Sequence, residues 1–392
     1  MREISRLLSC ATLAVGLAAG AAVADVSVTV HYLRQLVDLP PVLSNLDPVP
    51  DDLGLAGAQL GLNDNTTTGR FLGQGYALEV TEVPVGGDLL EAARAALGAT
   101  DLVVIDAPAD ALLAIADLPE AQDALLFNAT APDERLRSAD CRANLLHTAA
   151  SNAMRTDALA QFLVMRRWDQ LALIQGTHPQ DRVFADSLRA SLAKFGLKLR
   201  SEKTWAFDAD MRRNAAQEVP LFTQDLKDHD ILLIADELHD FGRYIAYNTW
   251  QPRPVAGSEG LVPQAWAPVV EQWGAAQLQS RFTDLAARDM RPEDYAAWAA
   301  LRVIGEAVTR TNSGDTATLR AYLLGPEFEL AAFLGRPLSF RDWNGQLRQP
   351  IPLVTERALV AQAPLEGFLH QVNELDTLGL DRPDSACTAF GN

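Results

Sequence analysis

Histidine and cysteine are scarce in this chain, and neither is spaced as metal ligands usually are. The 392 residues include six histidines and three cysteines, with no H-x-x-x-H pair and no C-x-x-C pair. Compact metal sites commonly take ligands at such short spacings. The sequence therefore predicts no metal site and no cofactor.

Sequence signatures of catalysis are missing as well. The chain has no G-x-S-x-G turn, no glycine-rich phosphate loop and no cysteine–histidine constellation. Such motifs place a nucleophile or a phosphate group for chemistry. We therefore expect a protein that is not an enzyme, and a secreted hydrolase is the least favoured class.

Positive charge is in short supply. The chain has 33 Lys and Arg against 51 Asp and Glu, a formal net charge of −18. Nucleic acids and anionic lipid surfaces attract proteins of the opposite sign. The balance therefore predicts that neither of them is a partner.

One weakly apolar stretch stands at the N-terminus, and no stop-transfer segment follows it. Arg2 and Arg6 precede the run Leu7–Ala22, and Ala22-Val23-Ala24 gives a small-x-small ending. This order is typical of a cleaved secretory signal peptide. We predict a signal peptide over residues 1–24 and a mature chain that works outside the cytoplasm; a lipoprotein box ending at Cys10 is the less favoured alternative.

Two cysteines remain after the predicted cleavage. Cys141 and Cys387 form an even pair in an oxidising compartment, where a disulfide is the simplest interpretation. Two separately buried thiols are the alternative.

Strand and helix patterns alternate along the mature chain, and the order restarts midway. Continuous apolar strands indicate parallel sheets that helices cover on both faces. Asp88, with Glu91 three residues later, predicts a helix start. Another helix is expected over about 53–63, ended by the turn-rich residues 63–69. The main expected strands are 26–30, 76–83, 102–105, 125–127, 171–174 and 231–234, and the main further helices are 110–116, 152–166 and 294–310.

Four segments in order resemble motifs of the type I periplasmic binding proteins, in particular the Leu/Ile/Val-binding family of ABC importers. Leu126–Leu136 resembles the family's "ISPGATNPEL" loop, and His147–Ala149 its first crossover. Gly257–Gly260 resembles its "GPEG" turn, and Arg336–Gly345 its late "G-x-(V/L)-x-F/W-D-x-x-G" segment. The likeness spans nearly the whole mature chain.

The resemblance implies an α/β fold with two doubly wound lobes of parallel sheet, joined by a hinge that the chain crosses three times. The crossings are expected near residues 148, 257 and 345. The first lobe would then comprise residues 25–147 and 258–345, and the second lobe residues 148–257 and 346–392.

A narrower resemblance concerns the C-terminal part. Glu366–His370, Glu374–Gly379 and Cys387 are similar to segments of substrate-binding proteins associated with pyrroloquinoline-quinone-dependent alcohol dehydrogenases. The Glu374–Gly379 segment could pack at the hinge or form a docking surface, and the sequence leaves both open.

The resemblance also implies a ligand site in the cleft between the lobes. In the family, a hydroxyl and backbone N–H groups hold an amino acid's carboxylate, and a glutamate holds its ammonium. Ala129 and Thr130 match the carboxylate loop, and Glu259 matches the ammonium partner. An enclosed zwitterion needs such partners at both ends. Thr130 as a turn cap and Glu259 as an exposed turn residue are the structural alternatives.

Three departures from the family pattern change the expected ligand. Residues 106–110 read Asp-Ala-Pro-Ala-Asp where the family has a serine-rich turn. The family's aromatic positions fall near Gln180-Asp181 and Asp236-Glu237, so the apolar lid for a branched side chain is largely lost. His178 follows a strand and could face the cleft. The tryptophans Trp266, Trp273 and Trp298 are expected in the core or at an interface.

We therefore expect an acidic pocket that favours a cationic or polyhydroxylated ligand over leucine. Its carboxylates would come from Asp106, Asp110, Glu237 and Glu259. For Asp106 and Asp110, helix capping or surface exposure is the favoured alternative, and for Asp236 and Glu237 a site role is supported by their place after a buried strand.

The resulting functional expectation is a monomeric solute-binding protein that delivers a small molecule to an ABC permease. The alternative is an accessory or chaperone-like partner of a periplasmic quinoprotein dehydrogenase, in which the fold persists and the ligand site has decayed.

Overall fold

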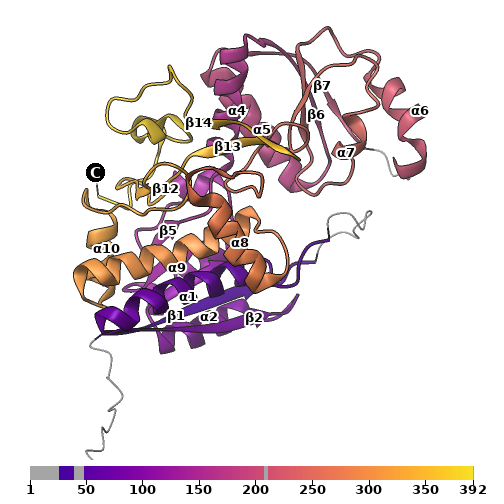
Figure 1. Cartoon of the computed structure of the whole chain (residues 1–392). Coiled ribbons are helices and arrows are strands. Elements are labelled where there is room, and N and C mark those ends of the chain that lie inside the picture. The colour runs from indigo at the N-terminus through magenta and orange to yellow at the C-terminus, as the bar shows by residue number, and fades with distance from the viewer. Residues whose placement is uncertain (1–25, 39–47, 207–210, 392) are drawn as a thin grey trace, which may run out of the picture.

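The structure is a computed structural model that describes residues 26–38, 48–206 and 211–391. The predicted signal peptide, residues 1–24, lies outside the described residues. Two α/β lobes lie one above the other in Figure 1, and the C-terminal segment runs beside them on one side. This arrangement matches the fold that the sequence predicts.

The first lobe is built on a five-stranded parallel sheet in the order β2-β1-β3-β4-β5. Helices α1, α8 and α9 pack on one face, and helices α2 and α3 pack on the other. The strands are β1 (Val26–Gln35), β2 (Gln74–Val83), β3 (Leu102–Asp106), β4 (Leu125–Asn128) and β5 (Leu145–His147). The helices are α1 (Leu55–Leu72), α2 (Leu89–Ala99), α3 (Ala109–Ala116), α8 (Ala275–Ala286), α9 (Pro292–Thr311) and α10 (Thr316–Leu323). The Asp88 side chain caps α2 by accepting from the Glu91 N–H at 2.9 Å, as predicted.

The second lobe has a four-stranded parallel sheet in the order β7-β6-β8-β9. Helices α4 and α5 cover one face together with two strands from the end of the chain, and α6 and α7 cover the other. The strands are β6 (Gln170–Gln175), β7 (Lys198–Thr204), β8 (Ile231–Ala235) and β9 (Val255–Gly257). The helices are α4 (Asn152–Arg166), α5 (Pro179–Lys194), α6 (Met211–Thr223) and α7 (Gly242–Ile245).

Short elements occupy the region between the lobes. An antiparallel sheet has the order β10-β13-β14, and β11 pairs with β12. Their bounds are β10 (Val262–Pro263), β11 (Ser339–Phe340), β12 (Leu347–Arg348), β13 (Ile351–Thr355) and β14 (Ala358–Ala363). The single-turn 3-10 helices are η1 (Pro119–Ala121), η2 (Glu134–Arg137), η3 (Gln272–Gly274), η4 (Glu374–Thr377) and η5 (Arg382–Asp384).

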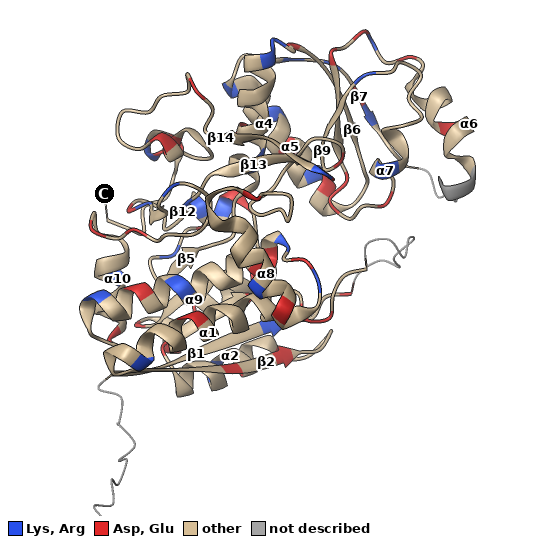
Figure 2. Ribbon diagram, viewed as in Figure 1, with Lys and Arg blue, Asp and Glu red and all other residues tan. Residues whose placement is uncertain are grey.

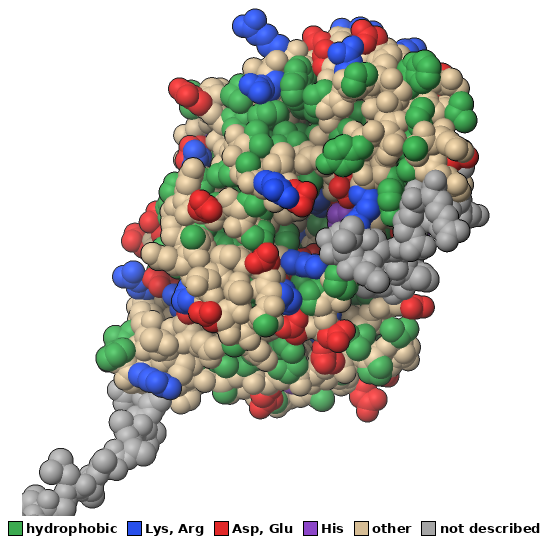
Figure 3. All heavy atoms as spheres, turned by 45° about the vertical axis from the view of Figure 1, so that its right-hand side comes forward, with side chains coloured by type: hydrophobic (Ala, Val, Ile, Leu, Met, Phe, Trp, Pro, Cys, Tyr) green, Lys and Arg blue, Asp and Glu red, His purple; other side chains and the backbone are tan. Residues whose placement is uncertain are grey.

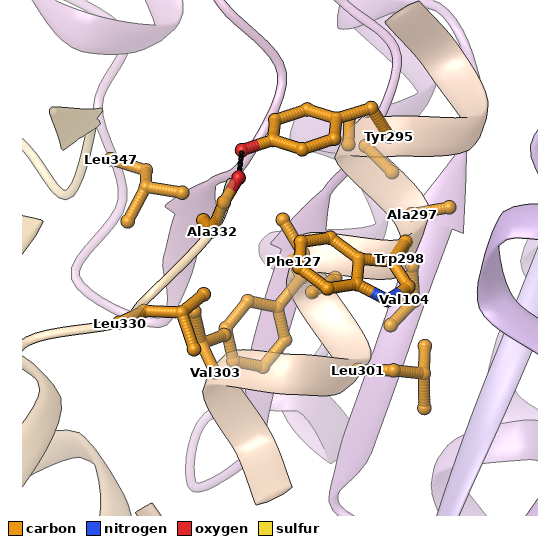
Figure 4. Close-up of a cluster of buried hydrophobic side chains, with 14 of the residues drawn as sticks. Val104, Phe127, Tyr295, Ala297, Trp298, Leu301, Val303, Leu330, Ala332 and Leu347 are labelled. Atoms are coloured by element: carbon orange, nitrogen blue, oxygen red, sulfur yellow. Dashed lines mark hydrogen bonds between the residues drawn. The ribbon is translucent and has the colours of Figure 1, made fainter. Parts of the chain in front are cut away.

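The core of the first lobe is rich in stacked aromatic rings. Trp266 stacks on Tyr295 with ring centroids 4.9 Å apart, and Tyr295 stacks on Trp298 at 5.5 Å. Figure 4 shows the Tyr295 hydroxyl directed at the Ala332 carbonyl, to which it donates at 2.8 Å. Trp266 and Trp298 are therefore core residues, as expected, whereas Trp273 is 45% exposed.

Helix α1 is longer than the sequence predicts. The helix was expected to end near residue 63, but it extends through residues 63–69 to Leu72. Long-range packing overrides the local turn preference of these residues. The buried Asn65 side chain donates to the Leu301 carbonyl on α9 at 2.7 Å. Gly61 lets the two helices approach closely, since a Cβ there would lie 2.7 Å from Leu301 Cβ.

Cys141 and Cys387 form a disulfide with their Cα atoms 5.6 Å apart. The predicted pairing is thus confirmed, and the alternative of two separate thiols is not observed. The bond joins the loop after η2 to the last residues of the chain.

Candidate functional site

The candidate site lies where the carboxyl ends of the two parallel sheets meet, which is the usual position of ligand sites in open α/β folds. Asp106 ends β3, Glu237 follows β8, and Glu259 follows β9. Figure 3 shows a hollow between the lobes with acidic, basic and histidine side chains around it. Acidic and basic residues lie close together on the facing sides of both lobes in Figure 2.

Asp106 is the centre of the site in the first lobe. Its carboxylate accepts the Thr130 hydroxyl at 2.6 Å and the Tyr32 hydroxyl at 3.1 Å. The Arg34 Nε lies 3.3 Å from the same carboxylate. Burial raises the pKa of Asp106, while the Thr130 hydrogen bond and the Arg34 charge act in the opposite direction.

The backbone donors of the predicted carboxylate loop are already used. The Ala129 N–H donates to the Ile105 carbonyl at 3.1 Å. The Thr130 and Ala131 N–H groups both donate to the Asn128 side chain, at 3.0 and 2.8 Å. An amino acid's carboxylate would have to displace these bonds, and it would also meet Asp106. The residues predicted to hold it are present, but their donors are bound within the protein.

Glu237 is the corresponding carboxylate in the second lobe, and Arg155 holds it with two contacts. Arg155 Nη1 and Nη2 donate to Glu237 Oε2 and Oε1 at 2.6 and 3.2 Å. The Ser258 hydroxyl donates to Glu237 Oε1 at 2.8 Å. Burial acts to raise the pKa of Glu237, but the Arg155 charge and hydrogen bonds outweigh it and lower this pKa.

Glu259, the predicted ammonium partner, has a histidine beside it. Its Oε1 lies 3.2 Å from His239 Nδ1, and the Glu259 side chain is 21% exposed. The hydrogen bond to Glu259 raises the pKa of His239. His239 has a positive φ of 56°, an uncommon backbone conformation for a residue with a side chain.

Asp181 and Asp236 accept hydrogen bonds from the backbone of the loops around the site. Asp236 is fully buried and accepts the N–H groups at the start of α7, from Asp240, Phe241 and Gly242, at 2.6–2.9 Å. Asp181 accepts the Glu237 N–H at 2.7 Å and the His178 N–H at 3.1 Å. Burial raises the pKa of Asp181 to about 6. Both carboxylates therefore position the loops that carry the exposed side chains.

The remaining predicted residues lie at the edge of the site. His178 Nε2 contacts Asp240 Oδ2 at 2.5 Å, and Gln180 is exposed in the first turn of α5. Asp110 lies on the surface with its side chain 89% exposed, where it pairs with Arg135.

The structure places arginine or histidine side chains beside the carboxylates of the expected acidic pocket. Each of its four carboxylates, Asp106, Asp110, Glu237 and Glu259, has a cationic or histidine side chain beside it. The pairing partners are Arg34, Arg135, Arg155 and His239, which come from elsewhere in the sequence. Asp106 and Glu237 thus form ion pairs with arginines at the site, whereas the Asp110 pair lies on the surface.

Arg34 and Arg155 were not among the predicted site residues. Arg34 lies beyond the expected strand 26–30, and nothing nearby in the sequence links it to Asp106. Arg155 lies in the first turn of α4, and its guanidinium lies over the Phe184 ring, with Cζ 4.5 Å from the ring centroid. Because α4 also carries the polar residues Asp157 and Gln161, Arg155 gave no distinct sequence signal of a buried ion pair.

One carboxylate connects the two lobes directly. Glu134 in η2 accepts the Ala153 N–H at the start of α4, and the Ser187 hydroxyl of α5 lies 3.4 Å away. A carboxylate at a helix N-terminus is favourable because it satisfies a free N–H group. Burial raises the pKa of Glu134. This contact holds η2 of the first lobe against two helices of the second.

A cavity of about 490 Å³ lies away from the cleft, beside the edge strand β14. Its lining residues include Trp273, Arg336 and Val360.

Within the described parts of the chain, no group of three or more His, Cys, Asp or Glu residues could hold a metal ion. None of the helices described is both long enough and apolar enough to span a bilayer.

Solved structures similar to the chain in fold include periplasmic binding proteins. A branched-chain amino acid ABC transporter periplasmic ligand-binding protein from Burkholderia xenovorans matches with a TM-score of 0.70 and 15% identity, over 93% of this chain and all of the other. A periplasmic binding protein from Burkholderia mallei matches at 0.67 and 15%, over 93% and 99%. An ABC transporter solute-binding protein from R. palustris, solved with benzoate, matches at 0.63 and 12%, over 92% and 99%.

These likenesses establish the type I periplasmic binding protein fold for this chain. No protein-family model matches the sequence, and no curated protein matches it.

Proposed function

We propose that this protein is the periplasmic substrate-binding component of an ABC importer and binds a small polar solute between its lobes. The observation that carries the proposal is the pair of facing charged groups, Asp106 with Arg34 on one lobe and Glu237 with Arg155 on the other. These two ion pairs can each bind one end of the same polar molecule. The predicted signal peptide and the solute-binding proteins of the same fold support this assignment.

The proposed mechanism is a shift of a hinge equilibrium, and no bond is made or broken. The moving bodies are residues 25–147 with 258–345, and residues 148–257 with 346–379, because the residues from Ser385 onward attach to the first lobe. A ligand that contacts both bodies stabilises the closed form by its extra contacts there. The closed form is then what a permease recognises.

We further propose that the ligand is not a free α-amino acid. In the first lobe, Ala129, Thr130 and Asp106 offer acceptor atoms, because their nearby donors are bound within the protein. In the second lobe, Glu237, Glu259 and His178 stand at the rim, with Gln180 further out. Such a rim suits a polyhydroxylated or cationic molecule that donates hydrogen bonds to carboxylates and accepts from Arg155.

The test is a thermal-shift screen of the mature protein against amino acids, alcohols, aldehydes, polyamines and polyols. A true ligand at 100 times its dissociation constant should stabilise the protein by about 2.7 kcal/mol. Glu237→Gln should abolish the shift, whereas Asp228→Asn, at a surface pair with Arg253, should leave it unchanged. Equal shifts in both variants would argue against binding at the cleft.

A second function is supported by the satisfied donors of the Ala129–Thr130 loop and by the narrower resemblance of Glu366–Gly379. In this alternative the protein is a non-transport accessory of a periplasmic quinoprotein alcohol dehydrogenase. A purified quinoprotein dehydrogenase would then gain activity or stability when the mature protein is added. Permease and ATPase genes beside this one would favour transport, and dehydrogenase genes alone would favour the accessory role.

A further inference from the structure

The C-terminal segment is fastened to the second lobe by buried hydrogen bonds. The Gly379 N–H donates to Asp157 on α4 at 2.8 Å, and the Gly379 carbonyl accepts from Lys194 on α5 at 3.0 Å. Gln161 on α4 donates to the Thr377 hydroxyl at 3.1 Å and accepts the Leu365 N–H at 3.0 Å. Asp157 and Gln161 are both buried. The segment therefore belongs structurally to the second lobe up to Gly379.

Six residues later, the same segment is fastened to the first lobe. The Ser385 hydroxyl donates to the Arg137 carbonyl at 2.8 Å, and the Ala386 N–H donates to the Ser138 hydroxyl at 3.0 Å. The Cys387 disulfide to Cys141 makes this attachment covalent. The guanidinium of Arg320 on α10 also lies over the ring of Phe390, 5.6 Å from its centroid.

The residues between these attachments lie along the third crossing of the hinge. The Arg341 guanidinium donates to the Leu378 and Leu380 carbonyls at 2.6 and 3.1 Å. Arg382 donates to both Asp342 oxygens at 2.6–2.7 Å. Figure 1 shows the C-terminus beside the junction of the lobes, away from the side on which α6 and α7 lie.

We propose that residues 379–387, the C-terminal strap, form a covalently closed fourth connection between the lobes that limits how far they rotate. A hinge moves by φ and ψ changes at a few residues in each crossing segment. Five residues separate Gly379 from Ser385, so these two attachments cannot move more than roughly 20 Å apart. A larger rotation requires the Asp157 and Lys194 bonds to Gly379, or the bonds at Ser385 and Ala386, to break.

This inference rests on the proposed function only in assuming that the lobes move. It adds that the strap, more than the three crossings, sets the range of that motion in the ligand-free protein. Arg137 connects the strap to the hinge, because its side chain donates to the Gln346 side chain and to the Ala149 carbonyl, at 2.8 and 3.0 Å. Motion of the strap is thereby coupled to the crossings near residues 148 and 345.

The test compares three forms of the mature, ligand-free protein. The first is Cys141→Ser with Cys387→Ser, which removes the covalent attachment. The second is Cys141→Ser with the chain ended after Arg382, which removes the whole first-lobe attachment. The third is Asp228→Asn, a control outside the strap that removes an exposed ion pair with Arg253 in the second lobe. Small-angle scattering measures the spread of lobe positions, and hydrogen exchange measures opening at each amide.

We expect the two strap variants to show a larger radius of gyration or a broader distance distribution than the native protein. Exchange at the crossings, residues 148–151, 257–262 and 345–350, should rise several-fold, while the central strands β3 and β8 keep their protection. The Asp228→Asn control should match the native protein.

Two results would overturn the inference. One is unchanged scattering and unchanged exchange at the crossings in both strap variants. The other is a rise in exchange that is equal at the crossings and in β3 and β8, because that would mean general destabilisation. Neither readout uses a ligand, so failure here is distinct from failure of the solute-binding proposal.

Discussion

The Thr130 hydroxyl donates to the Asp106 carboxylate at 2.6 Å, so the group expected to hold a ligand's carboxylate holds a carboxylate of the protein instead. This hydrogen bond occupies the Thr130 hydroxyl and places the negative charge of Asp106 beside it. The consequence for ligand choice is direct, since a second carboxylate at this position would be repelled.

We predict that the protein does not bind leucine, isoleucine or valine tightly. Loss of a hydroxyl and an N–H donor to a buried carboxylate should cost about 1.5–3 kcal/mol each. Together they weaken binding by roughly 10²–10⁴. Calorimetric titration of the mature protein with leucine measures this, and a dissociation constant below about 10 μM would contradict the prediction. Asp106→Ser, which restores a hydroxyl and removes the charge, should bind leucine more tightly than the native protein.

Arg155→Met should destabilise the protein by about 3 kcal/mol, because it leaves Glu237 as a buried carboxylate without its cation. Both side chains are only 18% exposed. Chemical denaturation measures the loss, and the double variant with Glu237→Gln should recover most of it. Arg253→Met, at an exposed pair, should change stability by less than about 0.5 kcal/mol. Equal effects of Arg155→Met and Arg253→Met would show that the Glu237 pair has no special role.

Stability should fall as the pH rises from about 4 to 6, through the titration of Asp181. The pKa of this carboxyl is raised to about 6 in the folded protein, above the value of about 3.9 for an exposed Asp. The folded state therefore binds more protons in this window, and stability is lost as they leave. The neighbouring charged groups are Asp236 and His178.

Asp181→Asn should flatten this pH dependence while lowering stability overall, since an amide can replace only one of the two acceptor oxygens. Urea denaturation at pH 4, 5 and 6 compares the two proteins. The prediction fails if the slope between pH 4 and 6 is the same in both.

We predict cleavage after Ala24 on export. The basic start, the apolar run and the Ala22-Val23-Ala24 ending favour a signal peptidase site. Intact mass of the exported protein decides the point. A mass that includes Met1, or a lipid on Cys10, would show that the segment is processed differently.

The sequence predicted the fold well, because the fold depends on local patterns. The apolar strand Ile231–Ala235 and the helix Asn152–Arg166 lie where their periodicity places them. Helix α1 was placed too short, because the contact that holds Asn65 in a helix comes from Leu301, 236 residues away in sequence. Turn propensity is a weak prior when tertiary packing opposes it.

The candidate site was predicted in part. Asp106, Thr130 and Glu237 stand at strand ends that the sequence could locate. Their partners could not be located, because Arg155 lies 82 residues from Glu237 and no spacing rule connects them. The net charge of a pocket therefore needs the three-dimensional pairing, even where every acidic residue is known.

The glycines of α1 have a consequence for the order of folding. Gly57 lets α1 lie so close to α9 that a Cβ there would be 1.9 Å from the Asp294 carbonyl oxygen, and the Gly54 N–H donates to Asp294 across 240 residues of sequence. The first lobe therefore cannot complete its core until the chain has passed through the second sheet. Closing so long a loop is entropically costly and slow. During synthesis, the N-terminal half of the first lobe therefore stays incompletely packed until α9 has been made, although it comes first in the chain.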